Sequence, residues 1–569
     1  MILERSYMNQ TRMSSLKKIR KAVFFLMPTL ALTFFGFISE GDNAEFYLKI
    51  YRGIDTYSKV YKEIAVSYVD TLNPEEFMRA GIDGMLKTLD PYTVFISDKE
   101  NDEIDLITTG KYGGVGVTIG LRDGYITVIN LLEGFSAAKQ GVEVGDRIIE
   151  VEGKATKGIS LEAVRQLVRG APGTEMKMKI EREGEKKPID FVLMREEISV
   201  HNIAYAGYVE EGVGYIRLER FSRTAGDDLR NAIKDLREKG ELKDLVLDLR
   251  DNPGGLLESA VDVVSKFVPE NSLIVSTRGR KSGSERKYTS SEAPMVRDLP
   301  LAVLVNRFSA SASEIVSGAI QDLDRGIIVG TRTFGKGLVQ TIIPLSENSS
   351  LKITTAKYYT PSGRCIQEID YGHRDGDGNG TTIPDSLKRE FRTVHNRRVW
   401  ESGGIVPDTI VSDSPRSTFL DELNRKAMFF KYANHYAAEN KTLPNNFEVT
   451  PNQIEDFAIF LKEKGFECEE EGEAKLQELR TLAAAARYDK SFVDGIENLE
   501  TILKEDKGKQ IYRYRDEIRS ALKTEIFARM IGDKARFASS FQSDKQLQTA
   551  IRILKSKKVF DKLLGMKGK

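Results

Sequence analysis

The sequence predicts a multidomain protein of mixed α/β (α+β) class, and three observations carry this prediction. A chain of 569 residues is too long for one hydrophobic core, which rarely serves more than about 250–300 residues. Between Val213 and Tyr359, apolar β-type runs alternate with helical runs, the pattern of a sheet flanked by helices. Beyond about Asp413 the chain is charge-dense with helical periodicity, which indicates a helical C-terminal domain, residues 413–569.

The N-terminal segment predicts export. Basic residues at positions 17, 18, 20 and 21 precede an uncharged, mostly apolar run from Ala22 to Ile38, as in a signal segment. The run just reaches the length that spans a bilayer, and its basic flank would stay inside. We expect residues 1–43 to be a cytoplasmic flank followed by a membrane anchor or signal segment. An uncleaved anchor at residues 22–38 is favoured, with the remainder on the extracytoplasmic (periplasmic) side.

Residues 44–110 are predicted to form a small helical part that precedes the β-rich region. Apolar residues between Tyr47 and Tyr68 recur at helical spacing, and Asp90 and Pro91 end the pattern.

Charge and cysteine usage exclude several classes of function. The chain has 85 basic and 85 acidic residues, so no basic field for nucleic acid is expected. Cys365 and Cys468 lie outside any metal-ligand spacing, so no metal site is predicted. A bridge between the two cysteines stays open if the chain is exported. The loop Asp375–Gly380 imitates the start of a calcium loop, but Ser386 stands where the bidentate Glu should be.

Residues 111–196 contain short β-type runs and glycine turns, one helical run before the last strand, and the turn GVEVGD at 141–146. In these features the region resembles a PDZ domain. The glycine-rich loop consists of Gly113, Gly114, Val115 and Gly116. Glycines let successive backbone amides converge on an anion, so this loop is expected to bind the terminal carboxylate of a peptide. The alternative is a glycine hairpin that only turns the chain.

A lysine held between two glycines follows a short apolar strand. The stretch from Gly330 to Lys336 has the GxxxxGK spacing of a phosphate loop. Gly337 replaces the hydroxyl residue that would bind magnesium, and a strand-like run follows where a helix should begin. A nucleotide site is therefore disfavoured. Apolar surroundings can instead keep a lysine neutral, so that it acts as a base.

A serine cluster lies at the start of a predicted helix. Ser309, Ser311 and Ser313 precede apolar residues at helical spacing. A nucleophile there would have free backbone amides beside it to bind an oxyanion, but any of these serines could simply cap the helix. Spacing alone does not choose among the three.

Four motifs in order, LVLDLRDNPGGLL, FSASASEI, TFGKGLVQ and YYTPSGR, together resemble the carboxyl-terminal processing peptidases, also called tail-specific proteases. The resemblance covers roughly residues 44–412 and makes residues 197–412 the protease core. It implies that Ser311 is the nucleophile, that Lys336 is its base and that Gln340 orients the lysine. It also implies oxyanion donors at Ala312 and at Gly254 or Gly255.

The function implied by the resemblance is that of a serine endopeptidase without cofactors. It would capture the apolar C-terminus of a protein substrate through the PDZ domain and cleave it through an acyl-enzyme. The alternatives are a catalytically silent PDZ scaffold, which the intact motifs disfavour, and a chymotrypsin-like PDZ protease, which lacks its motifs here. The helical regions are expected to serve packing, gating or association, including assembly with a second copy of the chain.

Overall fold

The computed structural model describes residues 42–97, 109–281, 283–346, 349–376, 378–412, 417–444, 446–468 and 471–566. The chain divides into two compact units, Met1–Thr88 and Leu89–Lys569. In the first unit the described residues form helices α2 (Asp42–Ser67) and α3 (Pro74–Leu86). α3 begins where the Asn73 side chain accepts a hydrogen bond from the Glu75 amide, with proline at the first helical position.

The predicted membrane anchor, residues 22–38, lies outside the described residues. Among the helices that the structure does describe, none is long and apolar enough to cross a bilayer.

The second unit begins with β1 and a PDZ-like β domain. Its main sheet has the order β3-β4-β5-β7-β8, with β6 paired to β5, while β2 pairs with β9. Alternate strand residues such as Met176, Met178 and Ile180 are fully buried, which is the period-two pattern of a half-buried sheet. The elements are β1 (Val94–Ser97), β2 (Lys111–Gly114), β3 (Val117–Arg122), β4 (Tyr125–Leu131), α5 (Ser136–Gln140), β5 (Arg147–Val151), β6 (Lys154–Ala155), α6 (Leu161–Val168), β7 (Glu175–Glu181), β8 (Ile189–Met194) and β9 (Glu196–Ser199).

The α/β core is built on a six-stranded sheet of order β10-β11-β12-β15-β16-β23. All neighbours run parallel except β10 and β11. Its central strands are unbroken apolar runs because they are buried on both faces. The strands are β10 (Ile203–Glu210), β11 (Val213–Leu218), β12 (Asp244–Asp248), β15 (Leu301–Val305), β16 (Ile327–Gly330) and β23 (Thr409–Ile410).

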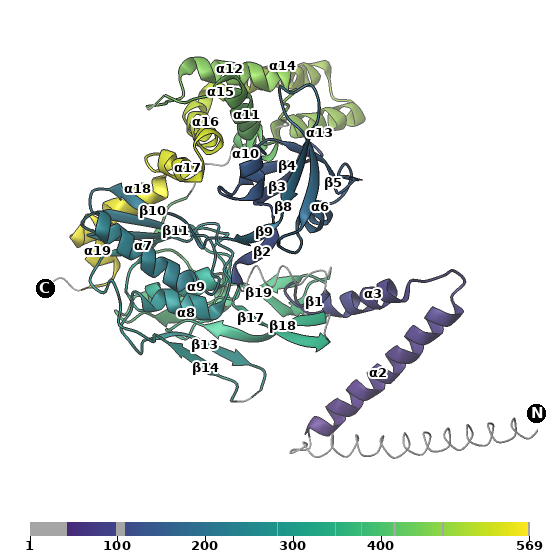
Figure 1. The fold of residues 1–569 in the computed structure, drawn as a ribbon, viewed down its shortest axis with the longest axis vertical. Helices are drawn as coiled ribbons and strands as arrows, with labels where there is room; N and C mark the ends of the chain where they lie inside the picture. Colours follow the sequence, from purple (N-terminus) through teal and green to yellow (C-terminus); the bar gives the residue numbers. More distant parts are fainter. Residues whose placement is uncertain are drawn as a thin grey trace, which may run out of the picture. The chain divides into compact units, whose positions relative to one another are not determined.

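Helices cover both faces of this sheet (Figure 1). Apolar residues of α7 (Ala225–Lys239), α8 (Leu257–Ser265) and α9 (Ala312–Asp322) share one core cluster with one face. The opposite face is covered by α18 (Lys545–Leu554) and α19 (Lys557–Leu563), from the end of the chain. The α/β core is thus completed by helices that follow its last strand by a long stretch of sequence.

A second, five-stranded sheet and two hairpins complete the core. β18 pairs with β1, β13 and β17, and β13 also pairs with β14. The turn of the calcium-like loop joins the hairpin strands β19 and β20, and its Asp377 lies outside the described residues. The elements are β13 (Leu273–Gly279), β14 (Arg286–Thr289), β17 (Leu338–Ser346), β18 (Ser349–Tyr359), β19 (Ile369–Arg374), β20 (Gly380–Thr382), β21 (Glu390–Arg392) and β22 (Arg398–Trp400).

Several of the remaining helices share a core of their own, rich in aromatic side chains such as Phe429, Tyr432, Phe457 and Phe460. Cys468 is buried there, and it forms no disulfide with Cys365, both residues being described. The predicted α/β class with helical parts at both ends is confirmed. The helices are α10 (Thr418–Arg425), α11 (Met428–Glu439), α12 (Pro451–Glu463), α13 (Glu471–Ala486), α14 (Lys490–Lys507), α15 (Gln510–Arg513), α16 (Arg515–Met530) and α17 (Asp533–Ser540).

Candidate active site

The candidate site lies at the carboxyl-terminal edge of the six-stranded sheet. Because β12, β15 and β16 run parallel, the loops that follow them leave the sheet at one edge, where ligands bind in open α/β sheets. These loops carry the NPGG turn, the serine cluster and the glycine-flanked lysine. The fold therefore collects three motifs that lie far apart in the sequence.

The three serines of the cluster have different environments. Ser309 and Ser313 are fully buried, and their hydroxyls donate to the carbonyls of Leu249 at 2.8 Å and Asn252 at 2.9 Å. Ser311 is only partly buried, and its hydroxyl donates to no residue that the structure describes. Of the three serine hydroxyls, only that of Ser311 donates to no backbone carbonyl among the described residues.

The backbone of Ser311 is held in an uncommon conformation. Its φ of 55° is rare for a residue other than glycine, and such strain is concentrated at functional sites. Ser311 is the N-cap of α9, and it forms a capping box with Glu314. The next amide, that of Ala312, has no backbone acceptor among the described residues, so it remains available to an oxyanion.

Glu314 joins the serine loop to the lysine loop. Its side chain is fully buried. One oxygen, Oε2, accepts the amides of Ser311 and Lys336, each at 2.9 Å. The other, Oε1, accepts the Thr333 hydroxyl at 2.6 Å and the Gly335 amide at 2.7 Å. Burial raises the pKa of Glu314 to about 6, and these hydrogen bonds oppose the rise.

Lys336 lies in the loop between β16 and β17, just before the strand. Burial, aided by the charge of Lys352, lowers its pKa to about 8. Its Nζ lies 4.2 Å from the centre of the Tyr92 ring. No hydrogen bond joins Nζ to the Ser311 hydroxyl, both residues being described, although the backbone amides of the two residues donate to the same oxygen of Glu314.

Gln340 lies on β17, which begins at Leu338, whereas Lys336 lies in the loop just before it. The Gln340 amide nitrogen donates to the Thr354 hydroxyl on β18 at 3.2 Å. The orienting role of Gln340 stays a prediction.

The NPGG turn packs against the serine loop. Gly254 has a φ of 104°, and a Cβ there would meet the Ala310 carbonyl at 2.7 Å and the Ala312 amide at 2.9 Å. The Gly254 amide donates to the Asn252 side chain at 2.8 Å. The Gly255 amide has no acceptor among the described residues. Of the two predicted turn donors, Gly255 is therefore the one left open.

A cavity of about 390 Å³ adjoins the lysine loop. Four of the residues that line it are aromatic or aliphatic, and two arginines and a glutamate are among the others. It is lined by Tyr92, Arg307, Arg332, Thr333, Phe334, Gly335, Gln367, Glu368, Ile369 and Tyr371. Such a cavity suits an apolar side chain of a bound peptide.

The predicted carboxylate loop divides between a strand and a turn. Gly113 and Gly114 belong to β2 and pair with β9. Val115 and Gly116 follow it, and Gly116 has a φ of 81°. Their two amides meet no backbone acceptor in the described part of the chain. These free donors lie beside β3, the edge strand of the domain's sheet.

Sequence reasoning missed two residues of this site. Glu314 was visible as the last residue of an S-x-x-E capping box, but its bonds to the lysine loop join segments far apart in the sequence. Tyr92 lies in a short loop before β1, where no periodicity or motif marks it.

Comparisons with known proteins match each region in turn. A model of peptidase family S41 matches residues 212–372, and a PDZ-domain model matches residues 103–181. A model of the C-terminal helical domain of a probable PDZ-protease matches residues 419–554.

Individual relatives match this chain over most of their own length. A carboxy-terminal-processing protease of Bartonella bacilliformis is 37% identical over 354 residues, which cover 62% of this chain and 81% of that protein. Carboxy-terminal processing protease CtpB of Bacillus subtilis is 32% identical over 320 residues, covering 56% and 66%. Among solved structures, the photosystem II D1 C-terminal processing protease is 27% identical, with a TM-score of 0.35 and coverage of 60% and 91%.

Proposed function

The chain belongs to the carboxy-terminal processing proteases of peptidase family S41, and we propose that it is an endopeptidase that cleaves through Ser311 and Lys336 after capturing apolar C-termini. That it is a serine-type peptidase with a PDZ domain follows from its family. The assignment of the reacting residues and of the substrate class is the proposal.

One observation carries the assignment of the dyad. The amides of Ser311 and Lys336 both donate to Oε2 of Glu314. A buried carboxylate shared in this way fixes the two loops relative to each other, because charge-assisted hydrogen bonds are short and directional. The backbones of the two residues that would exchange a proton are therefore fixed by hydrogen bonds to the same oxygen atom.

The proposed reaction is acyl transfer. Neutral Lys336 takes the proton of the Ser311 hydroxyl as Oγ attacks the peptide carbonyl, and the amides of Ala312 and Gly255 receive the oxyanion. The lysine ammonium then protonates the leaving amine, and the peptide bond breaks. Water, deprotonated by Lys336, attacks the ester and regenerates Ser311.

Lys336 must first leave Tyr92 for this reaction. An aromatic face attracts the ammonium rather than the neutral amine, so the contact favours the protonated lysine. Loss of the proton weakens that attraction and frees the amine to turn toward Ser311. The lowered pKa of Lys336, about 8, keeps a useful fraction neutral near physiological pH.

The PDZ domain supports the proposed preference for C-termini. A peptide could add as a strand to the edge strand β3, with its carboxylate on the amides of Val115 and Gly116. The free donors of this loop suit an anion. The peptide would be held by its end while an upstream bond reaches Ser311.

The experiment compares the wild-type protein with Ser311→Ala and Lys336→Ala on one unfolded substrate, prepared with a free or an amidated apolar C-terminus. We expect both variants to fold normally and to lose cleavage. The wild type should cleave the free-acid form faster. Near-normal turnover by either variant would refute the dyad, and equal rates on the two ends would remove the carboxylate from substrate selection.

We also propose that the protein acts outside the cytoplasm, anchored by residues 22–38, and that its helical regions support assembly with a second copy. Both proposals rest on sequence patterns alone. Protease accessibility in spheroplasts tests the first. Sedimentation of the chain from residue 44 tests the second, and a monomer at micromolar concentration would contradict it.

A further inference from the structure

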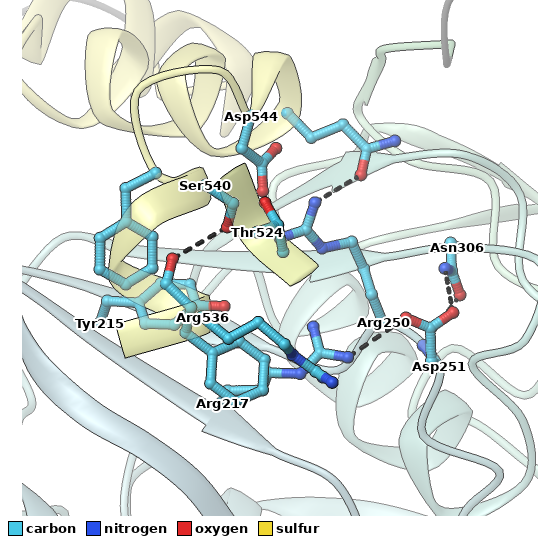
Figure 2. A pocket seen from close by; sticks show the side chains of 12 residues that line it. Tyr215, Arg217, Arg250, Asp251, Asn306, Thr524, Arg536, Ser540 and Asp544 are labelled. Atoms are coloured by element: carbon cyan, nitrogen blue, oxygen red, sulfur yellow. Dashed lines mark hydrogen bonds and ion pairs between the residues drawn. The ribbon is translucent and has the colours of Figure 1, made fainter. Parts of the chain in front are cut away.

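The last helices of the chain reach the edge of the sheet that carries the candidate active site. Leu547, Ala550 and Ile551 of α18 pack in one cluster with Val246 and Leu304 of the central strands. This packing places the start of α18 beside the residues that follow β12. Figure 2 shows the junction, where Asp544 and Arg250 line one cavity.

Arg250 is held from the side of α18 by two residues. Its Nη2 donates to Oδ2 of Asp544 at 2.6 Å, and its Nη1 donates to Oε1 of Gln546 at 3.1 Å. Asp544 is also the N-cap of α18, since its Oδ1 accepts the Leu547 amide at 3.0 Å. Gln546 is fixed in turn by a hydrogen bond to the Val411 carbonyl.

On its other side, Arg250 is paired with a fully buried carboxylate. Its Nε and Nη2 contact Asp248 at 3.0 and 2.6 Å, and its backbone amide donates to the same side chain at 2.9 Å. Burial alone would raise the pKa of Asp248, but the Arg250 guanidinium holds it below its ordinary value. Arg250 is therefore a buried charge that needs both of its acidic partners.

The residues directly after Arg250 form the turn that faces the nucleophile. Asp251 and Asn306 exchange two hydrogen bonds, at 2.8 and 3.1 Å. The Asn252 carbonyl accepts the Ala310 amide at 3.0 Å. The turn ends at Gly255, whose amide is the open donor. The Gly255 amide thus belongs to a stretch, residues 250–255, whose first residue is hydrogen-bonded to Asp544 and Gln546.

We propose that Asp544 is a positioning residue for this peptidase, which fixes the oxyanion turn by holding Arg250. The inference rests on the proposed function, because it assumes that the turn amide receives the oxyanion. If Asp544 has this role, the C-terminal helices contribute to the geometry of the catalytic centre. Without the carboxylate of Asp544, Arg250 loses one of its two acidic partners, and the turn loses one of the contacts that fix its position.

The test uses Asp544→Asn in the full-length protein. Asparagine caps a helix as well as aspartate does, so α18 keeps its N-cap while Arg250 loses a charge. We expect kcat to fall at least ~10-fold with KM within about twofold, a fraction of the 10²–10³ that loss of an oxyanion donor costs. The rate at which a fluorophosphonate labels Ser311 should fall in parallel.

Asp489→Asn is the matched control. Asp489 caps α14 through the Phe492 amide at 3.0 Å, and it has no arginine partner among the described residues. This variant should keep wild-type kcat. An equal loss of kcat in both variants would show that the effect comes from helix capping, and it would overturn the proposal. An unchanged kcat in Asp544→Asn would also overturn it.

A charge rescue separates positioning from folding. Gln546→Glu keeps the acceptor on Arg250 and supplies a new carboxylate, but it loses the hydrogen bond to the Val411 carbonyl. Relative to the single variant Gln546→Glu, the double variant Asp544→Asn/Gln546→Glu should therefore keep most of kcat. Failure to keep it, with a cooperative unfolding transition retained, would overturn the proposal. Ser311→Ala, assayed beside these variants, reports on the proposed function separately, because its inactivity does not depend on Asp544.

Discussion

The side-chain nitrogen of Lys336 lies 4.2 Å from the centre of the Tyr92 ring. Two opposing effects meet in this contact. Burial favours the neutral amine, whereas the ring face favours the ammonium. Burial is the main cause of the lowered pKa of Lys336, about 8. If Lys336 is the base, as proposed, its availability should therefore depend on pH.

The pH profile of cleavage should follow the titration of Lys336. Because only the neutral amine accepts the serine proton, kcat/KM should rise with pH, with a midpoint of about 8. Tyr92→Leu removes the ring that stabilises the ammonium, so the midpoint should move to lower pH. Tyr92→Phe keeps the ring face and should leave the midpoint in place. A profile that falls with pH over this range would contradict a lysine base.

Glu314→Gln should abolish most of the activity. The carboxylate accepts four hydrogen bonds, two on each oxygen. In glutamine an NH₂ group replaces one of these oxygens, so that a donor faces two other donors. Leaving buried donors unpaired costs about 1–3 kcal/mol each, so the free energy of unfolding should fall by several kcal/mol, or the loops should separate. We expect at least a ~100-fold loss of kcat in the folded fraction.

Ser309→Ala is the matched control for that variant. It also removes buried hydrogen bonds beside the same loop, because the Ser309 hydroxyl donates to Leu249 and accepts the Asn306 amide. We expect a loss of about 1–3 kcal/mol in stability with most of the cleavage retained. Comparable kcat values for the two variants would show that Glu314 has no special part in the site.

The fold class and the loops of the candidate site could be predicted because their signals are local. Unbroken apolar strands and helical periodicity identified the α/β core, and short motifs marked the loops after β12, β15 and β16. The packing of α18 on the sheet could not be predicted in this way. An amphipathic pattern shows that a helix buries one face, but it does not say which surface covers that face.

The site residues show the same division. The S-x-x-E pattern of Ser311 and Glu314 is a local signal, whereas the bonds from Glu314 to Gly335 and Lys336 depend on how two distant loops meet. The expected pairing of Gln340 with Lys336 also depends on tertiary structure, because Lys336 lies in the loop that ends at Gly337 and Gln340 lies on the strand that follows. This pairing stays a prediction.

Gly254→Ala should remove cleavage by displacing the oxyanion turn. The added methyl group would lie 2.7 Å from the Ala310 carbonyl and 2.9 Å from the Ala312 amide, and backbone atoms cannot yield as a flexible side chain can. We expect a loss in kcat of about 10²–10³, as when an oxyanion donor is removed. Gly283→Ala is the control, because its φ is also positive at 76° while nothing lies within 4 Å of the new methyl group. Equal losses of kcat in the two variants would show that backbone strain, and not the contact with the serine loop, causes the effect.

Gly116→Ala should remove the preference for a free C-terminus while leaving Ser311 reactive. Gly116 has a φ of 81°, and a Cβ there would meet the Cβ of Phe135 at 2.5 Å. The loop must therefore shift, and the amides of Val115 and Gly116 lose their common direction toward an anion.

Binding of a fluorescent apolar peptide, measured by anisotropy, should weaken at least ~10-fold for the free acid, with little change for the amide. The labelling of Ser311 by a fluorophosphonate should stay at the wild-type rate. Gly124→Ala is the control within the same domain, since its φ of 78° is similar and its surroundings are open. If Gly116→Ala bound the free acid as tightly as the wild type does, the terminal carboxylate would have to be held elsewhere, and the loop would serve only to turn the chain.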